Sequence, residues 1–173
     1  MTLKSVTAEE VTAKLGAFDS VIDARSPAEF ADDHLPGAVN WPVLDNDERR
    51  EVGTEYKQVS AFDARKHGAA IVARRVAEIV ERHVHDKPRE WQPLVYCWRG
   101  GQRSGTLAWF LSQIGFRVQV LQGGYKAVRR RVGEQREPLP ELGNKTPAEM
   151  LRNPEGQRAV ELVLERMRGG LPA

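Results

Sequence analysis

Short β-prone runs alternate with helical segments along this chain, and this alternation limits the folds that the chain can adopt. Apolar runs typical of strands lie at residues 20–25, 93–97 and 117–121. Each run is followed within a few residues by a segment with helical signals. Strands that alternate with helices usually form parallel β-α-β units. We therefore expect an α/β domain with a central parallel sheet and helices on both faces.

Five further segments complete this expectation. A capping box at residues 7–10 opens a short helix, and a stripe of apolar residues predicts a long helix over 61–85. Residues 34–42 combine turn residues with a short strand. Residues 44–60 are polar and irregular, which indicates either a solvated loop or a functional insertion. A last amphipathic helix is expected at about 147–168.

Composition indicates a soluble globular protein, because 40% of the 173 residues are hydrophobic and 29% are charged. After Glu137 the sequence becomes rich in Pro, Gly and Asn, so we expect a folded domain at 1–135 and a helical tail at 136–173. No apolar run approaches the roughly 18 residues of a membrane span, and the start has no signal-peptide core. The one cysteine cannot form an internal disulfide. We expect a cytoplasmic protein that does not contact a membrane.

Positive charge is concentrated in one part of the chain. The net charge is +2, yet the segment from Trp91 to Gly133 contains no Asp or Glu and has a charge of +7, which leaves −5 for the rest. Its cations are Arg99, Arg103, Arg117, Lys126, Arg129, Arg130 and Arg131. Such an asymmetry favours an anionic partner or substrate.

The single thiol, Cys97, lies within this cationic segment, in the stretch "YCWRGGQRSG". It follows a strand and precedes a helix that we expect to begin at Ser104. Ligands of open α/β sheets bind beyond the carboxyl ends of strands, and a helix N-terminus there offers unpaired N–H groups. Gly100 and Gly101 allow the backbone to turn its N–H groups inward. The pattern predicts an anion cradle with a sulfur at its base.

The surroundings of Cys97 favour the thiolate. Thiols beside Arg or at a helix N-terminus have pKa values of about 3.5–7.5, against about 8.5 in a free cysteine. A thiolate attacks electrophilic sulfur, selenium or phosphorus, or accepts sulfur as a persulfide. The alternative is an inert core cysteine, which is common in proteins. A position between a strand end and a Gly-Gly loop flanked by Arg argues against that alternative.

Four motifs occur in the order typical of a rhodanese-like domain. They are "DARSPAEF" (23–30), "HLPGAVN" (34–40), "YCWRGGQRSG" (96–105) and "GFRVQVLQGGYKA" (115–127). From residue 1 to about 135, the chain therefore resembles this family. The resemblance implies an α/β fold of the rhodanese type and sulfur transfer through Cys97.

Within that family, "NDERREVGTEYKQVS" (46–60), the Cys97 loop and "GGYKAVRR" (123–130) resemble the rhodanese domain of the tRNA 2-selenouridine synthases. These enzymes replace the sulfur of wobble 2-thiouridine by selenium from selenophosphate, through a geranylated intermediate. The resemblance implies that Cys97 is the nucleophile and carries sulfur or selenium as a persulfide or selenide, with no separate cofactor. Arg99 and Arg103 would orient a selenophosphate or thiosulfate-type donor. The anion would lie on the backbone of Trp98, Arg99, Gly100, Gly101, Gln102 and Arg103.

The chain departs from that family after its first domain. Members continue into a P-loop domain with the motif G-x-x-x-x-G-K-[ST], whereas "GNKT" (143–146) resembles it only superficially. We therefore expect a truncated, split or degenerate member that acts with a separate P-loop partner.

Two other functions fit the same residues. Cys97 and Arg103 satisfy the C-x5-R spacing of cysteine-dependent phosphatases, although Tyr96 stands where His usually precedes the Cys and no acid lies nearby in sequence. The second alternative function is a non-catalytic RNA-binding module, in which Trp98 stacks on a base. Its possible tRNA-binding residues, which also fit a solvated helix face, are Lys126, Arg129, Arg130 and Arg131.

Three residues are expected to support the loop. Ser104 follows it directly, and Asp23 and Arg25 lie at the end of the first predicted strand. The alternative for Asp23 and Arg25 is a simple ion pair on the surface. The four histidines give no metal-binding pattern, because there is no second Cys and no H-E-x-x-H motif, so we predict no metal site.

Overall fold

Five parallel strands form the centre of the molecule. The computed structural model describes residues 3–134, 143, 145–150 and 154–160. The sheet order is β1-β5-β4-β2-β3, and every neighbouring pair is parallel. The strands are β1 (Lys4–Val6), β2 (Ser20–Asp23), β3 (Ala38–Asn40), β4 (Pro93–Tyr96) and β5 (Gln119–Leu121). The expected parallel sheet is confirmed.

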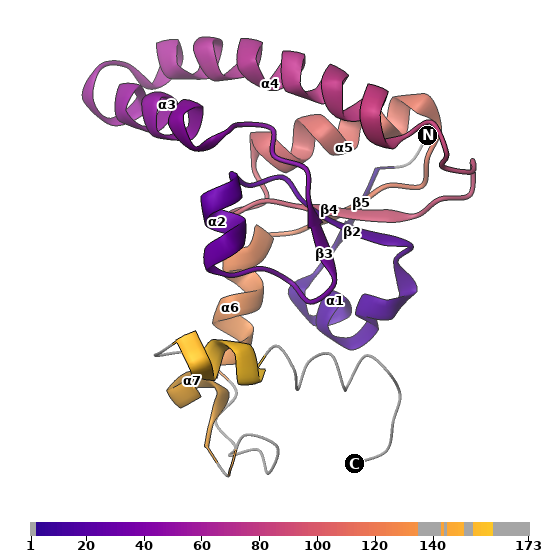
Figure 1. The fold of residues 1–173 in the computed structure, drawn as a ribbon, viewed down its shortest axis with the longest axis vertical. Helices are drawn as coiled ribbons and strands as arrows, with labels where there is room; N and C mark the ends of the chain where they lie inside the picture. Colours follow the sequence, from indigo (N-terminus) through magenta and orange to yellow (C-terminus); the bar gives the residue numbers. More distant parts are fainter. Residues whose placement is uncertain (1–2, 135–142, 144, 151–153, 161–173) are drawn as a thin grey trace.

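Helices cover both faces of this sheet, as expected (Figure 1). On one face, α4 and α5 pack over a core cluster that includes Ile71, Val76 and Leu107. On the other face, α1 and α6 pack over a second cluster that includes Val11 and Val128. The helices are α1 (Ala8–Lys14), α2 (Pro27–Asp32), α3 (Asn46–Gln58), α4 (Ala61–His83), α5 (Gln102–Ile114), α6 (Gly124–Glu134) and α7 (Pro147–Met150), with a 3-10 turn at Leu15–Ala17.

Local sequence signals explain where several helices begin. Thr7 and Glu10 form the predicted capping box of α1, in which each side chain accepts the other residue's backbone N–H. Ser26 forms the same box with Glu29 at the start of α2, where Pro27 occupies the first helical position. The long helix predicted over residues 61–85 is present as α4 and ends at His83.

The structure corrects two sequence-based expectations. The segment expected to be irregular contains α3, a helix that begins with a capping box between Asp45 and Glu48. No residue of α3 is fully buried, so the helix lacks the apolar stripe by which helices are recognised. The strand β1 was not predicted, because only Val6 of its three residues is buried. In addition, α5 begins at Gln102, two residues before the expected Ser104.

Strand register brings the candidate residues to one edge of the sheet. Asp23 lies opposite Tyr96 where β2 pairs with β4, and the N–H of Ala24 donates to the Tyr96 carbonyl at 2.8 Å. The segments that follow β2 and β4 therefore leave the sheet side by side. The turn after β5 reaches the same edge and contains Gly123 and Gly124.

Part of the C-terminal segment packs on α6. Residues 154–160 are helical, and Val160 is buried in the same core cluster as Val128 and Val132 of α6. The helix expected at 147–168 lies partly outside the described residues, and α7 accounts for its first turn. Among the helices that the structure describes, none combines the length and apolarity needed to cross a membrane.

Candidate functional site

Cys97 occupies the first position after β4, at the start of the loop that leads into α5. Only 3% of the residue is exposed, so Cys97 is buried where the loop begins. The Ser104 hydroxyl, which is fully buried, donates a hydrogen bond to the Cys97 sulfur at 3.1 Å. A donor directed at sulfur stabilises a thiolate more than a neutral thiol. Ser104 therefore supports the thiol directly.

The loop presents a row of free backbone donors. Within the described part of the chain, no group accepts a hydrogen bond from the N–H groups of Trp98 through Arg103. Gly100 has a φ of +66°, in the left-handed region where glycine is favoured. The last two of these N–H groups, at Gln102 and Arg103, belong to the first turn of α5 and carry its partial positive charge. Together these donors suit an oxyanion beside the sulfur.

The turn after β5 supports this loop from behind. The N–H groups of Tyr125 and Lys126, in the first turn of α6, donate to the carbonyls of Cys97 and Trp98 at 2.8 and 3.0 Å. These two carbonyls are thereby directed toward α6. A Cβ atom on Gly124, whose φ is +63°, would lie 2.3 Å from the Cys97 carbonyl oxygen. The close contact of the two segments thus requires glycine at position 124.

An ion pair between two helices fixes the end of the loop. The Arg103 guanidinium donates to both carboxylate oxygens of Glu29 in α2, with Nη1–Oε2 at 2.7 Å and Nη2–Oε1 at 3.4 Å. Burial alone would raise the pKa of Glu29, but the hydrogen bond and charge of Arg103, the Ser26 N–H and Arg49 outweigh it and lower the pKa. Glu29 was not among the predicted site residues, because its capping box with Ser26 gives no sign of a contact 74 positions away.

Two other loop side chains differ in their surroundings. Arg99 is exposed and forms no ion pair with any residue that the structure describes, so its charge is available to a ligand. Trp98 is half-buried, and its ring lies 6.3 Å from that of Tyr125 between centroids. The Trp98 ring thus packs partly on the fold.

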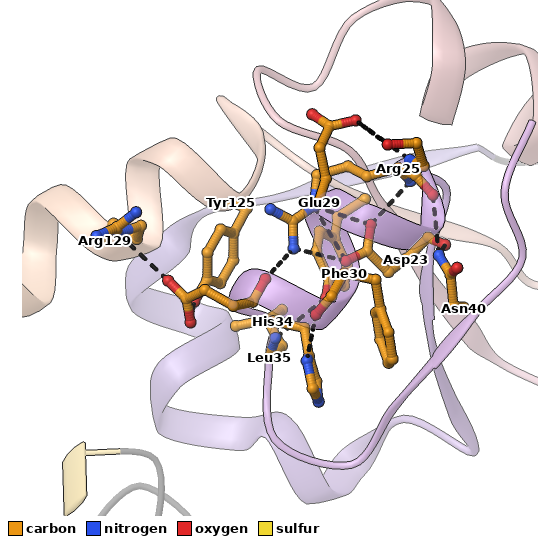
Figure 2. A network of polar contacts seen from close by, with 12 residues as sticks. Asp23, Arg25, Glu29, Phe30, His34, Leu35, Asn40, Tyr125 and Arg129 are labelled. Carbon is orange, nitrogen blue, oxygen red and sulfur yellow. Dashed lines mark hydrogen bonds and ion pairs between the residues drawn. The ribbon is translucent and has the colours of Figure 1, made fainter. Parts of the chain in front are cut away.

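Asp23 and Arg25 form a buried ion pair, so the alternative of a surface pair is wrong. Arg25 Nη2 lies 2.7 Å from Asp23 Oδ2, and at most 3% of either side chain is exposed. Figure 2 shows the Arg25 guanidinium between Asp23 and the ring of Tyr125, whose centroid is 4.5 Å from Arg25 Cζ. Because Tyr125 also donates its N–H to Cys97, the pair supports the loop through one intermediate residue.

The same network continues through Asp33. Arg25 donates to the Asp33 carbonyl, and the Tyr125 hydroxyl donates to Asp33 Oδ1. Burial, followed by the hydrogen bond and charge of Asp33, raises the pKa of Tyr125, which therefore remains a neutral donor. Asp33 Oδ2 is buried and accepts no hydrogen bond within the described residues, but Arg129 Nε lies 3.4 Å from it. These contacts hold Tyr125 in one orientation.

The cations of α6 are partly engaged in these internal contacts. Arg129 pairs with Asp33, and Arg131 Nη2 lies 3.5 Å from Glu9 Oε1 on α1. Lys126 is exposed and lies at the loop end of the helix. Of the four residues predicted to bind tRNA, at least two therefore contribute to the packing of α6.

The geometry does not favour the phosphatase alternative. Glu29 is an acid that the fold brings to the loop, but it is bonded to Arg103 and its lowered pKa keeps it ionised. An ionised carboxylate cannot donate the proton that a leaving group requires. Among the described residues there is no cluster of three or more His, Cys, Asp or Glu side chains that could hold a metal ion.

Comparison with known proteins identifies similar chains. The family model of the rhodanese-like domain matches residues 7–131. The tRNA 2-selenouridine synthase of Nitrosomonas europaea is 37% identical over 126 residues, and that of Chromohalobacter salexigens is 40% identical over 120 residues. These alignments cover 70% and 65% of this chain but only 32% and 31% of the two relatives, so the chain spans about a third of their length.

A solved structure and a second family model add to this comparison. The N-terminal domain of a Clostridium difficile 630 protein has 32% sequence identity and a TM-score of 0.63, and the match covers 75% of this chain and 98% of that domain. The family model of the antitoxin Xre/MbcA/ParS C-terminal toxin-binding domain matches residues 136–170.

Proposed function

Since this chain belongs to the rhodanese-like domain family, we propose that it transfers sulfur or selenium through Cys97. With thiosulfate, the Cys97 thiolate attacks the outer sulfur, the S–S bond of the donor breaks, and sulfite leaves with the bonding electrons. Cys97 is then a persulfide, whose outer sulfur passes to an acceptor. A selenophosphate-type donor would place its phosphate group on the same N–H groups, with selenium beside the sulfur.

One observation carries this proposal. Cys97 opens a loop whose backbone N–H groups have no acceptor within the described residues, while the carbonyls of Cys97 and Trp98 are bonded to α6. An oxyanion leaving group can therefore be stabilised next to the sulfur that attacks. Ser104 adds a hydrogen bond to the sulfur itself.

Intact-mass measurement tests the proposal directly. Incubation with thiosulfate should add the mass of one sulfur atom to the wild-type chain, and a reductant should remove it. A parallel incubation with selenodiglutathione tests for selenium, because the Cys97 thiolate can displace one glutathione thiolate from its selenium. Cys97→Ser should gain neither atom. A wild-type chain that remains unmodified by both donors would contradict the proposal.

We further propose that the acceptor is the wobble 2-thiouridine of tRNA. The support is the similarity to tRNA 2-selenouridine synthases, together with the exposed cations Arg99 and Lys126 beside the loop. Because the chain covers about a third of those relatives, the assay includes the part of such a relative that the chain does not match. Nucleoside analysis of tRNA incubated with selenophosphate, the chain and that part should show 2-selenouridine. Its formation without the chain, or by Cys97→Ser, would argue against this role.

A second proposal concerns residues 136–170, where the antitoxin family model matches. We propose that this segment binds a protein partner of the toxin class. Coexpression should relieve the growth arrest caused by a toxin whose antitoxin carries this domain, and the two proteins should elute together in gel filtration. Cys97→Ser should still relieve the arrest, because this binding does not require transfer of sulfur or selenium. Persistent arrest with separate elution would refute the second proposal.

A further inference from the structure

The Glu29 carboxylate contacts two arginines that come from different helices. Its Oε2 atom lies 2.7 Å from Arg103 Nη1 on α5 and 3.7 Å from Arg49 Nε on α3. Both guanidinium groups therefore lie next to a single carboxylate oxygen at the end of the Cys97 loop. We propose that Arg49 and Arg103 together bind the tetrahedral dianion of the donor, and that Arg49 is a donor-binding residue contributed by α3. This inference rests on the proposed transfer function of Cys97.

The two arginines differ in how tightly Glu29 holds them. Arg103 forms two hydrogen bonds, and 17% of its side chain is exposed. Arg49 is at ion-pair distance without a hydrogen bond, and 42% of its side chain is exposed. Arg103 is therefore fixed in position, whereas Arg49 can turn from Glu29 to an incoming anion at little cost. Two guanidinium groups around one carboxylate leave a net positive charge there before the anion arrives.

A glycine on α3 provides the space that Arg49 occupies. A Cβ atom on Gly53 would lie 2.7 Å from Arg49 Nη1, so the guanidinium lies over the backbone of the next helical turn. Glycine weakens the interior of a helix by about 1 kcal/mol relative to alanine. The contact is with the far end of a flexible side chain, so Gly53 permits this position of Arg49 without being required by it.

The position of α3 is itself fixed relative to the loop. The Asn46 side-chain oxygen accepts the N–H of Ala28, in the first turn of α2, at 2.9 Å. Arg75 of α4 donates to Glu48 at 3.2 Å and pairs with Asp45 at 3.5 Å. These contacts join the start of α3 to both α2 and α4, and Arg49 belongs to this anchored first turn.

Protection of Cys97 from alkylation measures anion binding without requiring transfer activity. Orthophosphate should slow the reaction of wild-type Cys97 with iodoacetamide, and the concentration dependence gives its dissociation constant. Arg49→Gln should raise this constant about tenfold, because one charge-assisted contact is lost. Arg50→Gln is the matched control, since it makes the same change of charge on the same helix and Arg50 pairs with exposed Asp47. Its dissociation constant should stay within about twofold of wild type.

An independent measurement compares sulfur donors that differ in charge. With sulfur donors, Arg49→Gln should raise the KM for thiosulfate, a dianion, about tenfold, but the KM for methanethiosulfonate, a monoanion, less than threefold.

The outcomes separate this inference from the function on which it rests. Equal dissociation constants for Arg49→Gln and Arg50→Gln, or an equal rise of KM for thiosulfate and methanethiosulfonate in Arg49→Gln, would overturn the role of Arg49. Neither result bears on whether Cys97 forms a persulfide. Conversely, phosphate protection that depends on Arg49, in a chain that accepts neither sulfur nor selenium, would support the anion site and refute the transfer function.

Discussion

Replacing Gly124 by alanine should damage both the stability of the domain and the reactivity of Cys97. The new Cβ would lie 2.3 Å from the Cys97 carbonyl oxygen, 2.5 Å from the Gly100 nitrogen and 2.7 Å from the Arg99 nitrogen. These are backbone atoms, which cannot be displaced by a change of rotamer. The Cys97 loop and the start of α6 must therefore move apart.

The magnitude follows from three contributions. A residue other than glycine at a φ of +63° costs roughly 1 kcal/mol. Loss of the hydrogen bonds from Tyr125 and Lys126 to the loop carbonyls costs roughly 1 kcal/mol each. The remaining overlap adds about 1–2 kcal/mol. We expect the free energy of unfolding to fall by about 4–5 kcal/mol, the sum of these contributions.

Urea unfolding measures this loss, and Gly115→Ala serves as its matched control. Gly115 also has a positive φ, +117°, but a Cβ there would meet nothing within 4 Å. That variant should lose only about 1–3 kcal/mol, from its backbone conformation alone. The rate of persulfide formation should fall at least tenfold in Gly124→Ala, at a temperature where the variant is folded, and stay unchanged in Gly115→Ala. If Gly124→Ala unfolds at the same urea concentration as Gly115→Ala, the account of the loop is wrong.

Three further predictions test other parts of the site. Ser104→Ala should fold normally but form the Cys97 persulfide about tenfold more slowly at neutral pH, because the sulfur loses a hydrogen bond. A stopped assay of sulfite release measures this rate. Arg129→Ala should lower the free energy of unfolding by about 1–3 kcal/mol, since buried Asp33 loses its counterion, whereas Lys126→Ala should change only the salt dependence of tRNA binding. The pKa of Glu29 is lower in the folded chain than in the unfolded chain. Its pair with Arg103 therefore stabilises the fold at pH values above the unfolded-state pKa, and this stabilisation is lost as the pH falls through the folded-state pKa. Glu29→Gln should remove that part of the acid dependence of the urea midpoint, and an unchanged dependence would contradict the assignment.

The sequence was sufficient to predict features that depend on neighbouring residues. The Cys97 loop is recognisable because a β-prone run, two glycines and a helix follow one another within twenty residues. The long helix α4 shows its buried stripe, which includes Ile71, Val72 and Val76. In both cases the physical signal and the structure it specifies lie in the same short segment.

Features that depend on distant contacts were not predictable in this way. The helix α3 has no fully buried residue and is held by α4, so its polar sequence looked irregular. The strand β1 is defined by its pairing with β5, more than a hundred positions later. Glu29 belongs to the site because it pairs with Arg103, 74 positions away, and Arg25 because it stacks on the ring of Tyr125. Such contacts between distant residues leave no pattern within a short stretch of sequence.

The helix α6 contacts both the Cys97 loop and the C-terminal segment. Its first turn donates hydrogen bonds to the carbonyls of Cys97 and Trp98, and its buried face shares a core cluster with Val160 of the C-terminal segment. A protein that bound this segment and shifted α6 would therefore change the geometry around the thiol. Thermodynamic linkage makes such an effect reciprocal, so the chemical state of Cys97 would change the affinity for that protein by the same factor. Binding at the C-terminal segment and a covalent change at Cys97 would therefore be linked through α6 by a single coupling free energy.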